Sequence, residues 1–223
     1  MPNSVSSPMR KIEFFFDCSS PWTYLAFHRI GQVARDGNAE LEWRPILVGG
    51  VFNSVNDSVY EQRANPIPAK LRYYTKDLAD WACNYGIRIG SPSVFPVNSV
   101  KAMRGTLVAL DHDLLVPYAR AVFEAYWADD VDISQDTAIA TIADSVGLEG
   151  AELLAKIRQP AYKTRLRDNT DELIARGGFG SPTMFLDRED MYFGNDRLGL
   201  LADALRNTEL QDTGLRDTRD HSR

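Results

Sequence analysis

Cysteine is scarce in this sequence, which holds only Cys18 and Cys83 among its 223 residues and no Cys-x-x-Cys pair. This scarcity argues against a disulfide-stapled scaffold and against dithiol exchange by the chain itself. It also favours a reducing compartment, so we expect a cytoplasmic protein. Histidine is equally sparse: the three histidines show no metal-ligand spacing, which predicts that the chain holds no metal.

Long apolar runs and an excess of basic residues are also missing. No run approaches the roughly 20 apolar residues that span a bilayer, and the first ten residues lack the apolar core of a secretory signal. The 25 basic residues are outnumbered by 31 acidic ones, for a formal net charge of -6. That balance argues against a nucleic acid or an anionic membrane as partner. The 44% apolar content suffices for one large domain, or for a domain with an insertion.

The first part of the sequence predicts a strand, a helix and a second strand. Residues 11–16 indicate a buried, aromatic-rich strand, 21–35 a helix and 41–48 a second strand that Gly49-Gly50 would end. Together they form a β-α-β unit of the right length for a parallel pair.

From about residue 53 to 177 the pattern is almost entirely helical. The chain then ends on a predicted β-hairpin and a helix. The expected helices are 69–85, 99–110, 116–128, 134–146, 149–158, 161–176 and 196–207, with Ser99 and Ser134 as N-caps, and the expected hairpin strands are 183–186 and 191–193.

The order β-α-β, helices, β-β-α predicts an α/β protein with a thioredoxin-like fold and a large all-helical insertion. We expect a discontinuous thioredoxin-like domain at 10–52 and 178–207, with the helical domain at 53–177. Residues 208–223 have almost no apolar side chains, which predicts a loose tail.

Ser20 lies where the first strand meets the first helix, in the run Cys-Ser-Ser-Pro-Trp-Thr. A thioredoxin-like redox protein would carry its two cysteines at Ser20 and Thr23. A helix N-terminus stabilises a thiolate, and a serine there can donate a hydrogen bond to a thiol that another molecule supplies. Ser20 could also be a plain helix N-cap. Cys18 is expected to pack in the core, and Asp17 either assists a proton transfer or ties the turn.

Pro182 stands directly before the strand 183–186. A cis bond at Ser181–Pro182 would let the Ser181 backbone face Ser20 and pair with a short extended peptide such as glutathione. An edge or turn device is the alternative for this proline. Asn195 or Asp196 caps the last helix. Alternatively, Asp196 binds the ammonium of a γ-glutamyl group and the helix start binds its carboxylate.

These motifs and several others resemble the family of 2-hydroxychromene-2-carboxylate isomerases and kappa-class glutathione transferases, within the DsbA-like group. The resemblance covers about 11 to 206. The segments that carry it are FFDCSSPWTYL (15–25), WRPILVGGVF (43–52), PAK (68–70), YTKDL (74–78), FPVNS (95–99), AYW (125–127), GFGSPTMF (178–185) and FGNDRL (193–198).

The resemblance implies glutathione as the cofactor, with Ser20 activating its thiol. The implied contacts of glutathione are Ser181, Pro182, Asn195, Asp196, Lys70 and Asn56, and the candidates for the substrate pocket are Trp22, Phe95, Asn98 and Trp127. The segment from Val51 to Pro66 departs from the family, which places a Gly-Asn after the second strand. Asn53 or Asn56 would substitute for that asparagine.

The activity implied is the glutathione-dependent isomerisation of 2-hydroxychromene-2-carboxylate, or a related intermediate of aromatic hydrocarbon catabolism, to trans-o-hydroxybenzylidenepyruvate. A small aromatic carboxylate is then the substrate, and the family suggests a homodimer. The alternatives are a kappa-type glutathione transferase, a DsbA-like oxidoreductase and a non-catalytic thiol-peptide binder. The missing Cys-x-x-Cys counts against the oxidoreductase.

Overall fold

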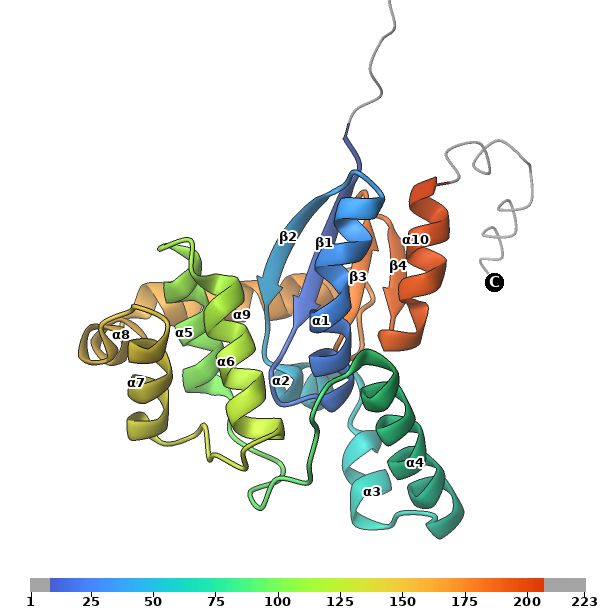
Figure 1. Cartoon of the computed structure of the whole chain (residues 1–223), viewed down its shortest axis with the longest axis horizontal. Coiled ribbons are helices and arrows are strands. Elements are labelled where there is room, and N and C mark those ends of the chain that lie inside the picture. Colours follow the sequence, from blue (N-terminus) through green and yellow to red (C-terminus); the bar gives the residue numbers. More distant parts are fainter. Residues whose placement is uncertain (1–8, 207–223) are drawn as a thin grey trace, which may run out of the picture.

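The computed structural model describes residues 9–206, and the sheet within them has the strand order β2-β1-β3-β4 (Figure 1). The central strand β1 (Lys11–Phe16) pairs in parallel with β2 (Glu40–Pro45) and antiparallel with β3 (Thr183–Leu186). β4 (Asp190–Phe193) pairs antiparallel with β3. This mixed sheet confirms the predicted thioredoxin-like fold.

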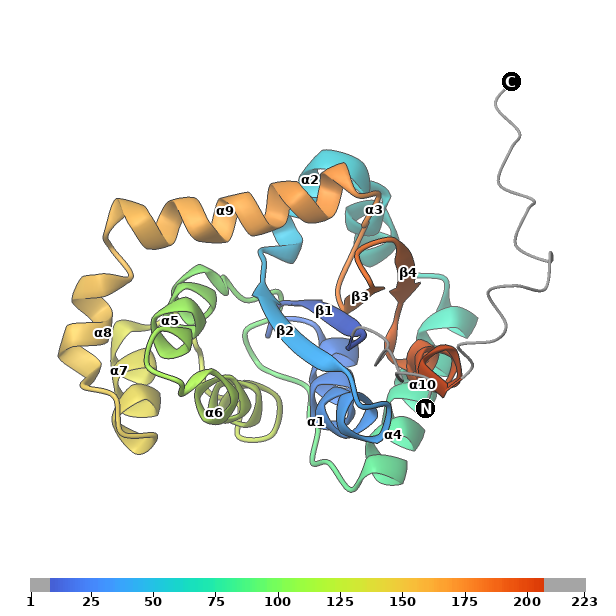
Figure 2. The same ribbon diagram turned by 90° about the horizontal axis from the view of Figure 1, so that it is seen from above.

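Helices cover both faces of the sheet. α1 (Pro21–Asp36) and α10 (Leu198–Arg206) lie on one face, and α9 (Pro160–Ala175) lies across the other (Figure 2). The remaining helices are α2 (Val48–Val55), α3 (Ser58–Ala64), α4 (Pro68–Tyr85), α5 (Val100–Leu110), α6 (Leu115–Trp127), α7 (Asp136–Ser145) and α8 (Gly150–Lys156), with a 3-10 turn (Asn195–Arg197) before α10.

The alternation of side chains along β1 supplies a core to each face. Phe14 and Phe16 join the main core cluster, which contains residues of α1 and of the helices α5 to α8. Phe15 points to the opposite face and packs edge-on against Phe185, in a second cluster with Leu173 of α9. The main core thus runs without interruption from the sheet into the helical block.

That continuity bears on the domain division. The expected boundary at residues 52 and 53 falls inside α2, and the helical block shares its core with the sheet. The division into a thioredoxin-like part and a helical insertion remains a proposal about this chain. The expected tail at 208–223 lies outside the described residues.

The structure corrects the predicted end of the second strand. β2 stops at Pro45, and Gly49 and Gly50 lie within α2 instead of ending a strand. The backbone N–H of Val48, the first residue of α2, donates to the carboxylate of Asp17 at 2.8 Å. A long-range acceptor therefore stabilises this helix start, which the glycines alone do not favour.

Of the two predicted serine caps, Ser99 does occupy the N-cap position of α5, but its side chain makes no capping bond and its hydroxyl donates to Asp17 at 3.0 Å. The predicted Ser134 cap is wrong, because the N-cap residue of α7 is Gln135. Ser134 lies in a turn before α7, where its N–H donates to Asp132 at 3.0 Å. The predicted bounds of α4 to α9 nevertheless fall within two residues of those observed. No helix among residues 9–206 is long and apolar enough to cross a membrane.

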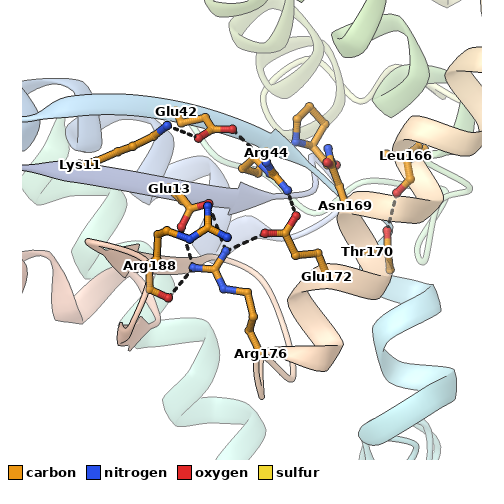
Figure 3. A network of polar contacts seen from close by, with 11 residues as sticks. Lys11, Glu13, Glu42, Arg44, Leu166, Asn169, Thr170, Glu172, Arg176 and Arg188 are labelled. Carbon is orange, nitrogen blue, oxygen red and sulfur yellow. Dashed lines mark hydrogen bonds and ion pairs between the residues drawn. The ribbon is translucent and has the colours of Figure 1, made fainter.

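A chain of alternating charges attaches α9 to the sheet (Figure 3). Arg176 binds the buried carboxylate of Glu13 with both guanidinium nitrogens, at 3.1 and 2.6 Å. It also binds Glu172, which contacts Arg44 of β2. Since Glu13 lies on β1, these contacts fix the helix that leads into the Ser181–Pro182 loop.

Candidate functional site

The Ser20 hydroxyl lies between the start of α1 and the loop before β3. Its oxygen accepts from the Thr23 N–H at 3.3 Å and donates to the backbone oxygen of Ser181 at 3.1 Å. The Ser181–Pro182 bond is cis. The predicted cis bond is confirmed, and the two motifs meet although about 160 residues separate them. Ser20 is half-buried and also caps α1 as the alternative reading predicted.

The Ser181 side chain joins three segments beneath this contact. Its hydroxyl accepts from the Asp17 N–H at 3.0 Å and lies 2.8 Å from the Thr23 hydroxyl. Thr23, at the second redox position of thioredoxin-like proteins, is fully buried. The side chains of Ser181 and Thr23 thus hold the loop, so the Ser181 backbone is the part that faces Ser20.

Asp17 is a fully buried carboxylate at the end of β1. It accepts hydrogen bonds from the N–H groups of Ser19 and Val48 and from the Ser99 hydroxyl, at 2.9, 2.8 and 3.0 Å. Burial raises its pKa, and these hydrogen bonds oppose the rise. The carboxylate therefore ties the Ser20 turn to the starts of α2 and α5.

Cys18 is not a reactive thiol in this arrangement. It is buried, and burial in first place, with the Asp17 charge in second, raises its thiol pKa well above the ordinary value. Its backbone oxygen accepts from the Trp127 indole at 2.8 Å. Cys83, the other free thiol, is exposed on α4. Among residues 9–206 no cluster of side chains is suited to a metal.

The turn before α10 places a buried amide next to an exposed carboxylate. Asn195 is 2% exposed, and neither polar atom of its side chain has an aligned hydrogen-bond partner within the described residues. The Tyr85 hydroxyl nevertheless lies close enough to Asn195 to oppose the rise in tyrosine pKa that burial causes. Asp196 is exposed and pairs with Arg197 at 3.5 Å. An amide with unused donors and acceptors beside a carboxylate suits an amino-acid head group.

Asn56 lies near the Ser181 loop, while Lys70 is isolated. The Asn56 amide donates to the backbone oxygen of Phe179 at 3.0 Å, two residues before Ser181. Asn53 instead accepts from the Tyr60 hydroxyl at 2.7 Å. Lys70 is exposed in the first turn of α4, with no hydrogen bond or ion pair within residues 9–206.

The four predicted pocket residues have different surroundings. Trp22 packs edge-on against Tyr74 with ring centroids 5.4 Å apart. Phe95 is 48% exposed and packs against the buried Trp127 at 6.2 Å. Asn98 precedes the N-cap of α5 and is exposed, and its side-chain oxygen accepts from the Val100 N–H at 3.1 Å.

Sequence reasoning missed several contacts that the structure places in this region. Thr23 was named as the second redox position and Ser99 as a helix cap, but neither signal predicted that Thr23 would contact Ser181 or that Ser99 would bind Asp17. Tyr74 on α4 could have been suspected, since an exposed aromatic in a helix is a weak sign of binding. Arg63 on α3 lies in a segment without a recognisable motif. Two surface hollows, one beside His112 and one beside Arg165, contain none of the site residues.

Comparisons with known proteins agree with this geometry. A family model described as DSBA-like thioredoxin domain matches residues 11–206. The chain is 31% identical over 196 residues to a 2-hydroxychromene-2-carboxylate isomerase from Pseudomonas sp. (strain C18), covering 87% of this chain and 89% of that protein. It is 29% identical over 209 residues to human glutathione S-transferase kappa 1, covering 88% and 91%.

Solved structures show the same likeness. A structure of 2-hydroxychromene-2-carboxylate isomerase superposes with a TM-score of 0.75 at 28% identity, over 88% of this chain and 95% of that one. A cytosolic disulfide reductase from Pseudomonas aeruginosa, solved with GSH, gives a TM-score of 0.61 at 16% identity, over 90% and 98%. The second match shows a likeness of fold alone.

Proposed function

The chain belongs to the DsbA-like thioredoxin family, where it groups with 2-hydroxychromene-2-carboxylate isomerases and kappa-class glutathione transferases, and we propose that it is a glutathione-dependent isomerase of an aromatic carboxylate. The observation that carries this proposal is the contact between Ser20 and the Ser181 backbone beside a cis-proline. Serine and threonine fill both redox positions there, so the site is suited to a thiol that comes from outside.

The residues present fit glutathione. On binding, the Ser20 hydroxyl would turn from the Ser181 oxygen to the sulfur, at the positive end of α1. The Ser181 carbonyl would then be free to accept from a peptide N–H. At the far end, Asn195 has an unsatisfied buried amide and Asp196 an exposed carboxylate. These two would bind the γ-glutamyl carboxylate and ammonium. Lys70 and Asn56 are proposed for the glycine end.

When bound, glutathione supplies a thiolate that can add to the unsaturated chain of the opened substrate, permit rotation and leave again. Ser20 holds the sulfur in its ionised form by donating a hydrogen bond. The exposed ring of Phe95, backed by Trp127, would form one wall for the aromatic substrate, and we propose the Trp22–Tyr74 pair as a second. Asn98 is retained only as a pocket-rim proposal, because its oxygen accepts from the Val100 N–H.

A kappa-type transferase is the second candidate, because relatives of both kinds match over most of the chain. Both activities need the same activated thiolate, and they differ in whether the sulfur leaves. The homodimer that the family implies, and the cytoplasmic compartment expected from the scarcity of cysteine, are part of the proposal as well.

A pair of variants tests the two halves of the site. Ser20→Ala should lower turnover on the order of 100-fold and change the glutathione Kd little, since one donor to the reacting sulfur is lost. Asp196→Ala should instead weaken glutathione binding by about 1.5–3 kcal/mol and change turnover at saturating glutathione little. Stopped-flow kinetics and calorimetry separate the effects. Turnover of Ser20→Ala within a factor of two of wild type would remove Ser20 from the mechanism.

A further inference from the structure

Arg63 lies between two aromatic rings that come from separate parts of the chain. Its guanidinium carbon is 5.4 Å from the ring centroid of Phe52 on α2 and 5.4 Å from that of Phe95 in the segment before α5. Arginine stacks on aromatic faces because the ring quadrupole attracts the cation. Within residues 9–206 the Arg63 guanidinium donates no hydrogen bond, so its N–H donors are available to a ligand.

Two routes of contact connect this cation with the Ser20 turn. Phe95 packs on Trp127, and the Trp127 indole donates to the backbone of Cys18, two residues before Ser20. On the other side, Trp22 packs on Tyr74. The positive charge of Arg63 is near enough to the Tyr74 hydroxyl to oppose the rise in pKa that burial causes. In Figure 1, α3 and α4 lie below the sheet, on the side where α1 begins.

The charge of Arg63 is not satisfied by an acid. Arg44 and Arg176 each contact two carboxylates, whereas Arg63 has no ion pair within residues 9–206. Arg63 is exposed near the end of α3. It also lies in the segment 51–66, which departs from the family pattern. An unpaired guanidinium next to two aromatic rings is suited to a ligand that is both planar and anionic.

We propose that Arg63 is a specificity-determining residue that binds the carboxylate of the aromatic substrate, while Phe52 and Phe95 hold its ring system. This inference rests on the proposed function for the identity of the substrate class. The guanidinium donates two parallel hydrogen bonds to the carboxylate oxygens. The aromatic body of the ligand then extends toward the Ser20 turn, between Phe95 and the Trp22–Tyr74 pair.

Glutathione also carries a carboxylate, on its glycine, so the test must distinguish two sources of the same group. The probes are 2-naphthoate, its neutral match 2-naphthamide, and glutathione, each titrated by calorimetry into the full chain. The variants are Arg63→Gln and Arg63→Lys. Arg72→Gln is the matched control, because Arg72 is an exposed arginine on α4 with no hydrogen bond, ion pair or ring contact within the described residues.

Wild type should bind 2-naphthoate more tightly than 2-naphthamide. Arg63→Gln should weaken naphthoate binding by about 10- to 100-fold, the range for a charge-assisted bidentate contact, and should leave naphthamide and glutathione unchanged. Arg63→Lys should fall between, and Arg72→Gln should match wild type. These binding results do not depend on turnover, so a chain without isomerase activity would refute the proposed function and leave this inference standing.

Four results would overturn the inference. Wild type could bind acid and amide equally, or Arg63→Gln could leave naphthoate binding unchanged. Equal weakening of both naphthyl probes would make Arg63 a part of the aromatic wall only. If Arg63→Gln weakened only the binding of glutathione, Arg63 would be assigned to the carboxylate of the glutathione glycine.

Discussion

Asp17 is the residue on which the geometry around Ser20 depends most. A carboxylate without exposure is costly to bury, and here three donors from three segments offset that cost. The donors are themselves buried or part-buried, so a substitution leaves them unsatisfied. The Asp17 carboxylate bonds to Ser19, Val48 and Ser99 and not to Ser20 or Ser181, so the role of this side chain is one of positioning.

Asp17→Asn should lower the free energy of unfolding by about 1–3 kcal/mol, because an amide offers one acceptor oxygen where three donors converge. Ser99→Ala, which removes one of those donors, should cost less. Urea unfolding of both variants and of the double variant measures the coupling. If Ser99→Ala costs as much in the Asp17→Asn background as in wild type, the two side chains do not interact.

At the scale of elements, α9 is the helix that connects the helical block to the cis-proline loop. Arg176, the residue that follows α9, forms an ion pair with Glu13 of β1, and Glu13 is only 1% exposed. Arg176 also stacks on the Phe185 ring of β3 at 3.9 Å. A buried pair of this kind adds little net stability, but removing one partner leaves a buried charge unpaired.

Arg176→Met should therefore destabilise the chain by about 3–5 kcal/mol, and Glu13→Met in the same chain should restore much of that loss. Lys76→Met is the matched control, since the pair of Lys76 with Asp80 is fully exposed to solvent and contributes little. Chemical denaturation gives the three values. A loss for Arg176→Met no larger than that of the control would show that this pair does not hold α9 in place.

The packing of α1 against α6 contains a titratable group. Burial, and then the charge of Arg120, lower the pKa of His28 from 6.5 to about 4. The unfolded chain therefore takes up this proton near pH 6.5 and the folded chain only near pH 4. The contribution of neutral His28 to the free energy of unfolding is therefore fully present above pH 6.5 and is lost as the pH falls toward 4.

This predicts that acidification from pH 7 to 4 costs wild type on the order of 1–2 kcal/mol more than His28→Gln, after allowance for the part-exposed ring. Denaturant unfolding at several pH values measures the difference between the two chains, which cancels the titration of shared carboxylates. Parallel curves for the two proteins would mean that His28 titrates normally in the folded state.

Local signals predicted some elements well. α4 ends at Tyr85 because Gly86 adopts a left-handed conformation with φ of 67°, and proline and serine mark the start of α1. The start of α2 was missed because it depends on an acceptor 31 residues away, Asp17. Ser99 does stand at the N-cap of α5, but its hydroxyl binds the distant Asp17 carboxylate instead of capping the helix. Contacts between distant segments, rather than propensities, decide these positions.

At the scale of the whole molecule, one core supports both the sheet and the helices that surround the site. Phe14 and Phe16 of β1 lie in the same cluster as Trp127 of α6, whose indole contacts the Ser20 turn. The sequence order of strands and helices was enough to predict this fold, and it brought the Ser20 and Pro182 motifs together. It could not place Arg63 or Tyr74, because no local pattern links them to that turn.

The central claim is that a serine site employs an external thiol catalytically. The measurement that tests it most directly follows the absorbance of 2-hydroxychromene-2-carboxylate and its open-chain product, with glutathione at a tenth of the substrate concentration. We predict complete conversion with glutathione and none without a thiol, because the chain has no dithiol at its redox positions and the sulfur leaves after each turnover. Equal rates without any thiol would contradict the account, and conversion that stops at one product per glutathione would assign the chain as a transferase instead.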